Sequence, residues 1–497
     1  MRNFLWNEFE RQENIDVLMI FITVLGLSRL SLRQIVKTLS RSESLPKSFV
    51  EVFAKAASLV ERWNYGVSEV LEFIQQEMKK PKLKSLVTRI QHSFKAGVSL
   101  EDFARIEYSK HRAEQENDFE KGLEKLRKLV EAYTTLISVI SLLTVSFLLV
   151  STIIGGGSDS FLQIALTSVA ATLGSTTLLF ATNSLRRPVF STHPIKPKSL
   201  QNLLATAPIV FATGTVIVLT APSFMTSLGG MTVTYASATL LAVGAPLSLH
   251  GYLGRRWYKK INQTESILPI FLKSFGDYLS ATGSIKSAVH MLTLSDFGPL
   301  NQILKKLEAR LKIGLSQTIS VKTFGVETCG RVGEKAFTVL AELLEAGARP
   351  GHACNILSEY VARTLMNDKR REQITSSLKT LSVPLHATLA AIFALLTTLL
   401  SILSQISRLV ESHLMLIKPI DTSMVVTYFY MIIAITSLIT TVNIYLSDGD
   451  SVLTLTYFFG IILSVSGATF LLMSTASEQV LSSFAGFGER IRSLTPG

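Results

Sequence analysis

Long stretches without any charged side chain constrain this sequence more than its other features do. A helix needs about 20 apolar residues to cross the roughly 30 Å hydrocarbon core of a bilayer. Each such stretch has room for one span, except that 199–254 has room for two around a turn at 220–230. The stretches that lack Asp, Glu, Lys and Arg are 132–158, 160–185, 199–254, 380–407, 422–447 and 451–477.

The chain is therefore expected to be an all-α, polytopic membrane protein with about seven transmembrane helices. Each span must be helical, because lipid offers no partner for an open backbone group. Only 17% of the residues are charged, against roughly 25% in soluble domains, and 47% are hydrophobic, which excludes a disordered chain. The expected spans are 132–154, 161–183, 202–221, 232–253, 380–403, 423–446 and 452–475.

The distribution of basic residues predicts the orientation in the membrane. Lys and Arg concentrate in 1–131, 184–200 and 254–379, and basic segments next to spans face the cytoplasm. Four spans separate the two long polar stretches, which is consistent with both lying on the same side. We expect a multi-pass protein of the cell membrane with a cytoplasmic N-terminus. The orientation of the last two spans stays open, because the flanking charges disagree.

Five regions follow from this reading. Residues 1–131 and 254–379 are expected to be cytoplasmic helical modules, since apolar residues recur with a period near 3.6 and strand-like alternation is scarce. Positive charge marks several segments rather than one patch, so a nucleic-acid partner is not expected. The remaining regions are four spans in 132–253 with a basic cytoplasmic loop at 184–201, three spans in 380–475 and a tail at 476–497.

The two modules resemble each other in sequence, which predicts an internal repeat. Three blocks correspond at offsets near 250 residues, and each block reads as a helix end, a turn and a new helix. The glycines fit the left-handed position after a helix, and the serines fit N-caps. Their expected role is structural. The repeated turn residues are Gly66, Ser68, Gly97, Ser99, Gly314, Ser316 and Gly347.

This architecture resembles the type II secretion F domain family, the membrane platform proteins of type II secretion systems, type IV pili and archaeal pili and archaella. The resemblance covers roughly residues 15–155 and 265–405, and the segment 326–347 is similar to the family stretch before the third block. Four spans between the modules look more like the archaeal branch.

The resemblance implies a platform without enzymatic activity. Its implied partners are a cytoplasmic hexameric secretion ATPase and prepilin subunits, beside membrane lipids and a second copy of the chain in a homodimer. Pilus, archaellum and secretion filaments are not distinguished. The alternatives are a polytopic transporter or sensor without a filament role, and a scaffold that does not contact an ATPase.

The sequence does not predict a catalytic, cofactor or metal site. The segment GVETCGRV (325–332) comes nearest to a phosphate-binding loop but lacks its Lys and its hydroxyl residue. Cys329 and Cys354 are not spaced as metal ligands, and His352 is a weak neighbour. Any ATP hydrolysis is therefore expected of a partner. In the spans, His386 beside Pro384 is expected to pack and hydrogen-bond between helices.

Basic clusters supply the remaining candidate contacts. One group is read either as a solvated loop or as a docking patch for an acidic face of the ATPase, together with one basic residue in the third block. Two groups next to spans are read mainly as lipid-headgroup anchors. The possible docking residues are Lys79, Lys80, Lys82, Lys84 and Arg349. The expected anchors are Arg255, Arg256, Lys259, Lys260, Lys369, Arg370 and Arg371.

Overall fold

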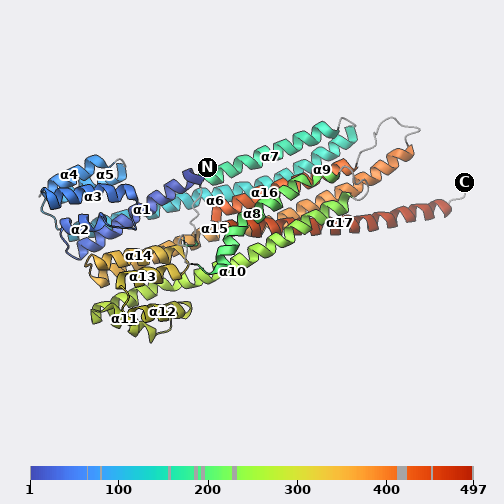
Figure 1. The fold of residues 1–497 in the computed structure, drawn as a ribbon. Helices are drawn as coiled ribbons and strands as arrows, with labels where there is room; N and C mark the ends of the chain where they lie inside the picture. The colour runs from blue at the N-terminus through green and yellow to red at the C-terminus, as the bar shows by residue number, and fades with distance from the viewer. Residues whose placement is uncertain are drawn as a thin grey trace. The chain divides into compact units, whose positions relative to one another are not determined.

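The computed structural model confirms an all-α architecture in the part of the chain that it describes (Figure 1). Regular secondary structure there consists of helices, and the only β-type pairing in this part is one isolated bridge. The described residues are 2–63, 65–78, 81–154, 158–183, 189–191, 196–225, 232–410, 422–448 and 451–494.

The chain divides into two compact units. Unit 1 holds Met1–Gly122, Arg187–Pro197 and Trp257–Arg370, and unit 2 holds Leu123–Arg186, Lys198–Arg256 and Arg371–Gly497. Residues 1–122 and 257–370, which make up most of the two predicted modules, thus belong to one unit. Below, residues 2–122 are called the N-terminal lobe of unit 1 and residues 257–370 its central lobe.

Three long helices have residues in both units. They are α6 (Leu100–Ile154), α10 (Thr232–Thr282) and α15 (Pro350–Val410). The predicted continuation of each module into a span at 131–133 and 379–382 is helical without interruption. Pro384 lies inside α15 without ending it.

The N-terminal lobe is built from short helices joined by tight turns. Its core includes Phe21, Leu39, Phe53, Leu71 and Ile90. Ser31 caps α2 through a capping box with Gln34, which fixes where that helix begins. Besides the first part of α6, its helices are α1 (Arg2–Leu27), α2 (Leu32–Leu39), α3 (Lys47–Arg62), α4 (Val67–Glu77) and α5 (Pro81–Lys95).

The central lobe has an aromatic core. Phe271 stacks on Phe324 with ring centroids 5.2 Å apart, and Phe337 meets Phe324 edge-on at 4.8 Å. The end of α10 and the start of α15 also belong to this lobe, together with shorter helices. These are α11 (Ile285–Thr293), η2 (Gly298–Leu300), α12 (Asn301–Lys312), α13 (Gln317–Glu327) and α14 (Arg331–Glu345).

One close helix contact recurs in both lobes. In the N-terminal lobe, a Cβ added to Gly26 of α1 would lie 3.1 Å from the Ala104 Cβ and 3.2 Å from the Leu100 carbonyl oxygen of α6. In the central lobe, a Cβ on Gly276 of α10 would meet Cys354 and Pro350 of α15. Each residue of the second set stands 250 positions after its counterpart. The two contacts thus stand at the offset of the predicted repeat, which stays a prediction.

Most of the predicted turn residues lie at helix ends. Gly97, Gly314 and Gly347 have φ values of 73°, 83° and 84°, in the region that favours glycine. The Ser99 hydroxyl accepts a hydrogen bond from the Asp102 amide at the start of α6. Ser316 is the N-cap of α13 but makes no side-chain capping bond.

The prediction for the turn at 66–68 needs correction. Gly66 has a φ of −68° and is itself the N-cap of α4, whereas Ser68 lies inside that helix. The Glu69 carboxylate accepts the Gly66 N–H at 2.9 Å, the N3-to-N-cap half of a capping box, and so fixes Gly66 as the residue at which the helix begins.

Unit 2 contains the apolar helices. Five helices among the described residues are long and apolar enough to cross a membrane: Lys198–Phe224, Thr232–Thr282, Pro350–Ile402, Thr422–Ser447 and Val452–Val480. The predicted spans 132–154 and 161–183 lie in α6 and α7 (Ser158–Thr182) but are not among these five. Seven spans therefore stay a prediction. The other helices of unit 2 are α8 (Lys198–Thr220), α9 (Pro222–Met225), α16 (Thr422–Asp448) and α17 (Val452–Leu494).

Helices α10 and α17 approach each other through small residues. A Cβ added to Gly244 would lie 2.7 Å from the Ser464 nitrogen, and one added to Gly460 would collide with the Ser248 backbone. Close approach at small residues is how apolar helices gain packing energy where water does not drive their association. The seam leaves no room for larger side chains at these positions.

This seam predicts opposite effects for two Gly→Ala changes. Gly460→Ala places a methyl group against the Ser248 backbone and should destabilise the protein by about 1–3 kcal/mol. Gly174→Ala in α7 has open space around the new methyl group and should be neutral or stabilising by up to about 1 kcal/mol. Thermal unfolding of the detergent-solubilised protein measures both, and equal melting temperatures would contradict the close packing.

Candidate functional site

The two lobes of unit 1 meet at a buried carboxylate. Glu342 of α14 is 9% exposed and reaches the loop between α2 and α3. It accepts hydrogen bonds from the hydroxyls of Ser42 at 2.6 Å and Ser44 at 2.9 Å, and from the Glu43 amide at 3.2 Å. Residues about 300 positions apart in the chain are thereby fixed together.

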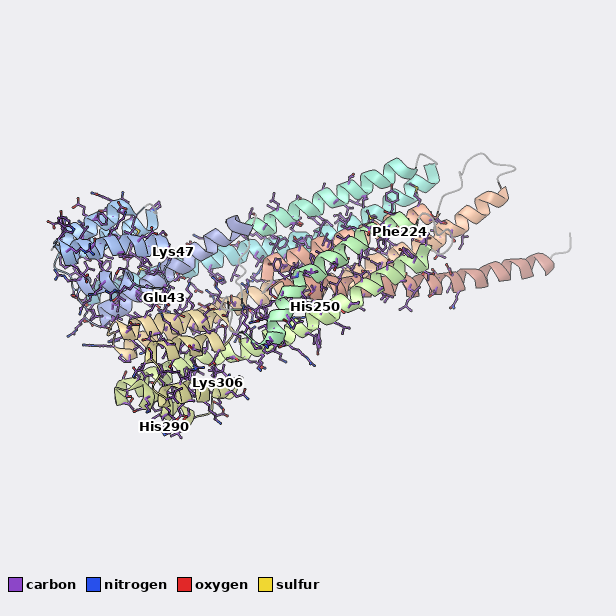
Figure 2. All side chains as sticks on the ribbon, viewed as in Figure 1. Glu43, Lys47, Phe224, His250, His290 and Lys306 are labelled. Atoms are coloured by element: carbon purple, nitrogen blue, oxygen red, sulfur yellow. The ribbon has the colours of Figure 1, made fainter. Side chains whose placement is uncertain are left out.

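Burial raises the pKa of Glu342, and the hydrogen bonds from Ser42 and Ser44 oppose that shift. At the edge of the same contact, Lys322 of the central lobe pairs with Glu43 at 2.7 Å. Figure 2 labels Glu43 on the N-terminal lobe. The loop is thus held by three donors to one carboxylate and by one exposed ion pair, and the buried carboxylate is the stronger constraint.

A second lobe contact runs between α6 and α15. Arg112 pairs with Glu359 at 2.7 Å, and Arg370 pairs with Glu116 at 2.5 Å and with Glu120 at 2.6 Å. The pairs join residues 247 to 254 positions apart, which brackets the offset of the predicted repeat. The two helices that lead from the lobes into unit 2 therefore lie side by side within unit 1.

These ion pairs bear on the predicted lipid-anchor group Lys369, Arg370 and Arg371. Arg370 binds carboxylates of the protein rather than being free for lipid, and Arg371 is only 3% exposed. Lys369 is exposed. The reason is that α15 lies against the acidic face of α6, which periodicity along one helix does not reveal.

The other predicted anchor group lies on α10. The Arg255 guanidinium lies 4.5 Å from the centroid of the Tyr457 ring, and Arg256 lies 5.2 Å from that of Tyr252. Lys260 lies 5.3 Å from the centroid of the Trp257 ring, and Lys259 is exposed. Cations over aromatic rings suit the headgroup region of a bilayer, so lipid contact stays the expectation for these four basic residues.

The candidate ATPase-docking residues are spread over both lobes. Lys79 and Lys80 lie outside the described residues, and the side chain of Lys82 is also outside them. Lys84 is exposed in the first turn of α5, while Arg349 is exposed at the turn after α14, where its amide donates to the Ser28 hydroxyl. The two described cations thus belong to different lobes, Lys84 to the N-terminal and Arg349 to the central one.

A second buried carboxylate organises the turn before α14. Glu265 of α10 is 2% exposed and accepts the N–H groups of Val332 at 2.9 Å and Gly333 at 3.2 Å. Burial raises its pKa to about 8, and those two backbone hydrogen bonds oppose the shift. These N–H groups lie at the end of the near-miss phosphate loop. A helix N-terminus that would otherwise attract an anion is thus occupied by the protein's own carboxyl group.

The chain between α7 and α8 also reaches this turn. Phe190 and Gly330 form an antiparallel bridge. The Ser191 N–H donates to the Cys329 carbonyl at 2.9 Å, and the Arg331 N–H donates to the Val189 carbonyl at 2.8 Å. The basic loop predicted at 184–201 is therefore not simply a solvated connection.

Polar side chains join four helices inside unit 2. The Tyr133 hydroxyl of α6 lies 2.9 Å from the Thr440 hydroxyl of α16, which lies 3.3 Å from the His386 Nε2 of α15. The Asn443 amide nitrogen of α16 reaches the Thr176 hydroxyl of α7 at 3.4 Å. His386 thus makes the interhelical hydrogen bond expected of it, and through Thr440 it connects α15 with α6.

Both cysteines are buried, and burial raises the pKa of each thiol. Cys354 packs against Gly276, and its pKa is raised to about 12. Such thiols are poor nucleophiles and poor metal ligands at neutral pH. Within the described residues, no group of three His, Cys, Asp or Glu side chains is placed to hold a metal ion.

Two curated proteins are similar to this chain over much of its length. Flagella accessory protein J of Methanocaldococcus jannaschii is 22% identical over 447 residues, which are 86% of this chain and 79% of that protein. Flagella accessory protein J of Methanococcus voltae is 24% identical over 375 residues, 72% of this chain and 65% of that protein. No protein-family model and no solved structure matches the chain. The similarity and the five apolar helices indicate an integral membrane protein.

The buried lobe contact predicts a large effect at one carboxylate and a small effect at its neighbour. Glu342→Ala leaves two hydroxyls and one amide without their acceptor and should cost roughly 2–4 kcal/mol. Glu345→Ala, one turn later and exposed, should stay within about 0.5 kcal/mol. Thermal unfolding and proteolysis at the 40–46 loop measure the difference. Equal behaviour of the two variants would contradict the contact.

The raised pKa of Glu265 predicts a pH dependence of stability. Because the folded pKa is about 8 and the unfolded value is 4.5, the folded state holds the proton more tightly. Stability from this group is full below the unfolded pKa and is lost as pH rises through about 8. Glu265→Gln keeps an oxygen acceptor without ionising.

The melting temperature of the variant should therefore fall less than that of the wild type between pH 6 and pH 8.5. The corresponding losses in the free energy of unfolding should differ by roughly 1–3 kcal/mol. Glu345→Gln on the exposed face serves as the control and should keep the wild-type slope. Parallel slopes for Glu265→Gln and the wild type would show that Glu265 does not titrate in this range.

Proposed function

We propose that this protein is the membrane platform on which a type IV pilus-like filament of the archaellum kind is assembled. The similarity to two flagella accessory proteins J supports the filament role. The apolar helices support a place in the membrane. The partners proposed are a hexameric secretion ATPase, filament subunits and membrane lipids.

The observation that carries the proposal is the continuity of α6, α10 and α15. Each is one helix with residues in the lobes of unit 1 and in the apolar helices of unit 2. A helix satisfies its backbone hydrogen bonds internally and bends only gently over such lengths. A displacement imposed on the lobes would therefore be transmitted along these helices rather than absorbed in a linker.

The mechanism proposed is mechanical coupling. ATP turnover in the partner moves the lobes, and the lobes move together because Glu342 and the α6–α15 ion pairs join them. In unit 2, the hydrogen bonds from Tyr133 through Thr440 to His386 tie α6 to α15. The apolar helices then lift filament subunits out of the bilayer.

The lobe contact also bears on the proposed homodimer. The α2–α3 loop and the α6–α15 faces are occupied within one chain. A second copy would therefore dock elsewhere, and the two lobes of one chain already supply a paired surface to an ATPase of even symmetry.

Deletion and copurification test the proposal. Removing the protein should abolish filaments while processed subunits remain in the membrane, and the tagged protein should retain a hexameric ATPase. Filaments of wild-type number after deletion would refute the platform role. Retention of a transported ligand or signalling partner instead would favour a transporter or sensor.

Charge reversal tests where the ATPase docks. Lys84→Glu and Arg349→Glu, made separately, should each be compared with Lys110→Glu, another exposed lysine of unit 1. Loss of one exposed charge pair should lower ATPase retention about fivefold. If neither substitution lowers retention relative to Lys110→Glu, docking does not use these basic residues.

A further inference from the structure

Three residues between α7 and α8 bind the central lobe as an extended strand. Val189, Phe190 and Ser191 lie in unit 1, whereas α7 and α8 on either side of them lie in unit 2. Two backbone hydrogen bonds, at 2.9 Å and 2.8 Å, hold the segment to Cys329 and Arg331. Phe190 is 7% exposed and Ser191 is 1% exposed, so the contact is buried and not a surface encounter.

The turn at 328–333 receives this segment, and its backbone is constrained at Cys329, Gly330 and Gly333. Cys329 has a φ of +58°, which turns its carbonyl away from the end of α13 and toward the segment. A Cβ on Gly330 would collide with the Glu265 carboxylate, and one on Gly333 would collide with the Thr328 hydroxyl. Backbone strain of this kind persists where surrounding contacts hold it.

Glu265 links the turn to α10. Its carboxyl group occupies the first N–H groups of α14, and it lies where only a glycine at 330 leaves room. The carbonyl of residue 329 and the N–H of residue 331 then remain directed outward, where they bond to the segment. The receiving surface is therefore assembled from α10, α13 and α14 together.

We propose that residues 189–191 are a strap that couples α7 and α8 to the central lobe throughout the working cycle. The helices on either side of the strap pack within unit 2, α7 against α16 and α8 against α17. The central lobe is continuous with unit 2 through α10 and α15, and the strap adds a third connection. The docking of the strap stands on its own, while its role in transmitting motion rests on the proposed function.

Hydrogen exchange tests the docking directly. Ser191→Pro removes the N–H that donates to Cys329 and still favours an extended residue before it. The Arg331 amide, which donates to Val189, should then exchange about tenfold faster, the factor expected for one lost buried hydrogen bond. Phe190→Leu keeps the backbone bonds and an apolar side chain and should exchange at the wild-type rate.

The amide of Ala336, inside α14, is the internal reference and should be unchanged in both variants. Exchange of Arg331 that is the same in Ser191→Pro and the wild type would overturn the strap. Accelerated exchange at Ala336 as well would show general unfolding of α14, and it would equally count against a specific contact.

A disulfide tests whether the strap stays closed. Residues opposite each other in an antiparallel pair have Cβ atoms about 4.5–5.5 Å apart, within reach of a disulfide after small adjustment. Ser191→Cys in a Cys354→Ala background should therefore crosslink to the native Cys329 under an added thiol oxidant at alkaline pH, which offsets the raised pKa of that buried thiol. Val189→Cys lies one diagonal step away, at roughly 7–8 Å, and should crosslink far less.

The crosslinked chain should assemble filaments at the wild-type level, because the strap does not open during the cycle. Ser191→Pro should lower filament number while the ATPase is still retained. If the Ser191→Cys variant forms no crosslink to Cys329, the docking is overturned, and loss of assembly on crosslinking would overturn its permanence. If deletion of the whole protein leaves filaments intact, the proposed function fails, but the exchange and crosslinking results still decide the strap.

Discussion

The structure depends on the ability of an α-helix to satisfy its own backbone hydrogen bonds. Apolar surroundings offer no partner to an open N–H or C=O group, so a chain that passes from a polar lobe into lipid has to stay helical across the boundary. Helices α10 and α15, which are long and apolar enough to cross a membrane, continue from the central lobe without a break, and α6 is likewise one continuous helix. The same constraint that permits membrane insertion therefore makes these helices stiff connections, and the proposed coupling follows from that stiffness.

Much of the fold could be predicted because its signals are local. A stretch without charged residues, a glycine after a helix and a 3.6-residue period are each visible in a short window, which is why the all-helical fold and five of the seven expected spans are found. The turn at Gly66 differed because Glu69 accepts the Gly66 N–H and the helix begins before Ser68. Both residues are good capping partners, and sequence alone does not decide between them.

The contacts that join the parts could not be predicted, because each depends on residues far apart in the chain. Glu342 and Ser42 are separated by 300 positions, and Arg370 and Glu116 by 254. In the sequence, Arg370 stands in a basic run before a span and is indistinguishable from a headgroup anchor. Only the position of α6 beside α15 shows that its charge is already paired. The 189–191 strap is equally hidden, since a single bridge leaves no strand-like pattern.

The two lobes of unit 1 share one close helix contact, and the central lobe also receives the 189–191 segment. The contacts of Gly26 with α6 and of Gly276 with α15 are 250 residues apart and fix the same helix geometry in each lobe. That geometry depends on the small residues at the contact and does not involve the turn at 328–333. In the turn at 328–333, Cys329, Gly330 and the Glu265 partner together form the edge that receives residues 189–191. The central lobe can therefore hold the 189–191 segment without altering the contact between α10 and α15 at Gly276.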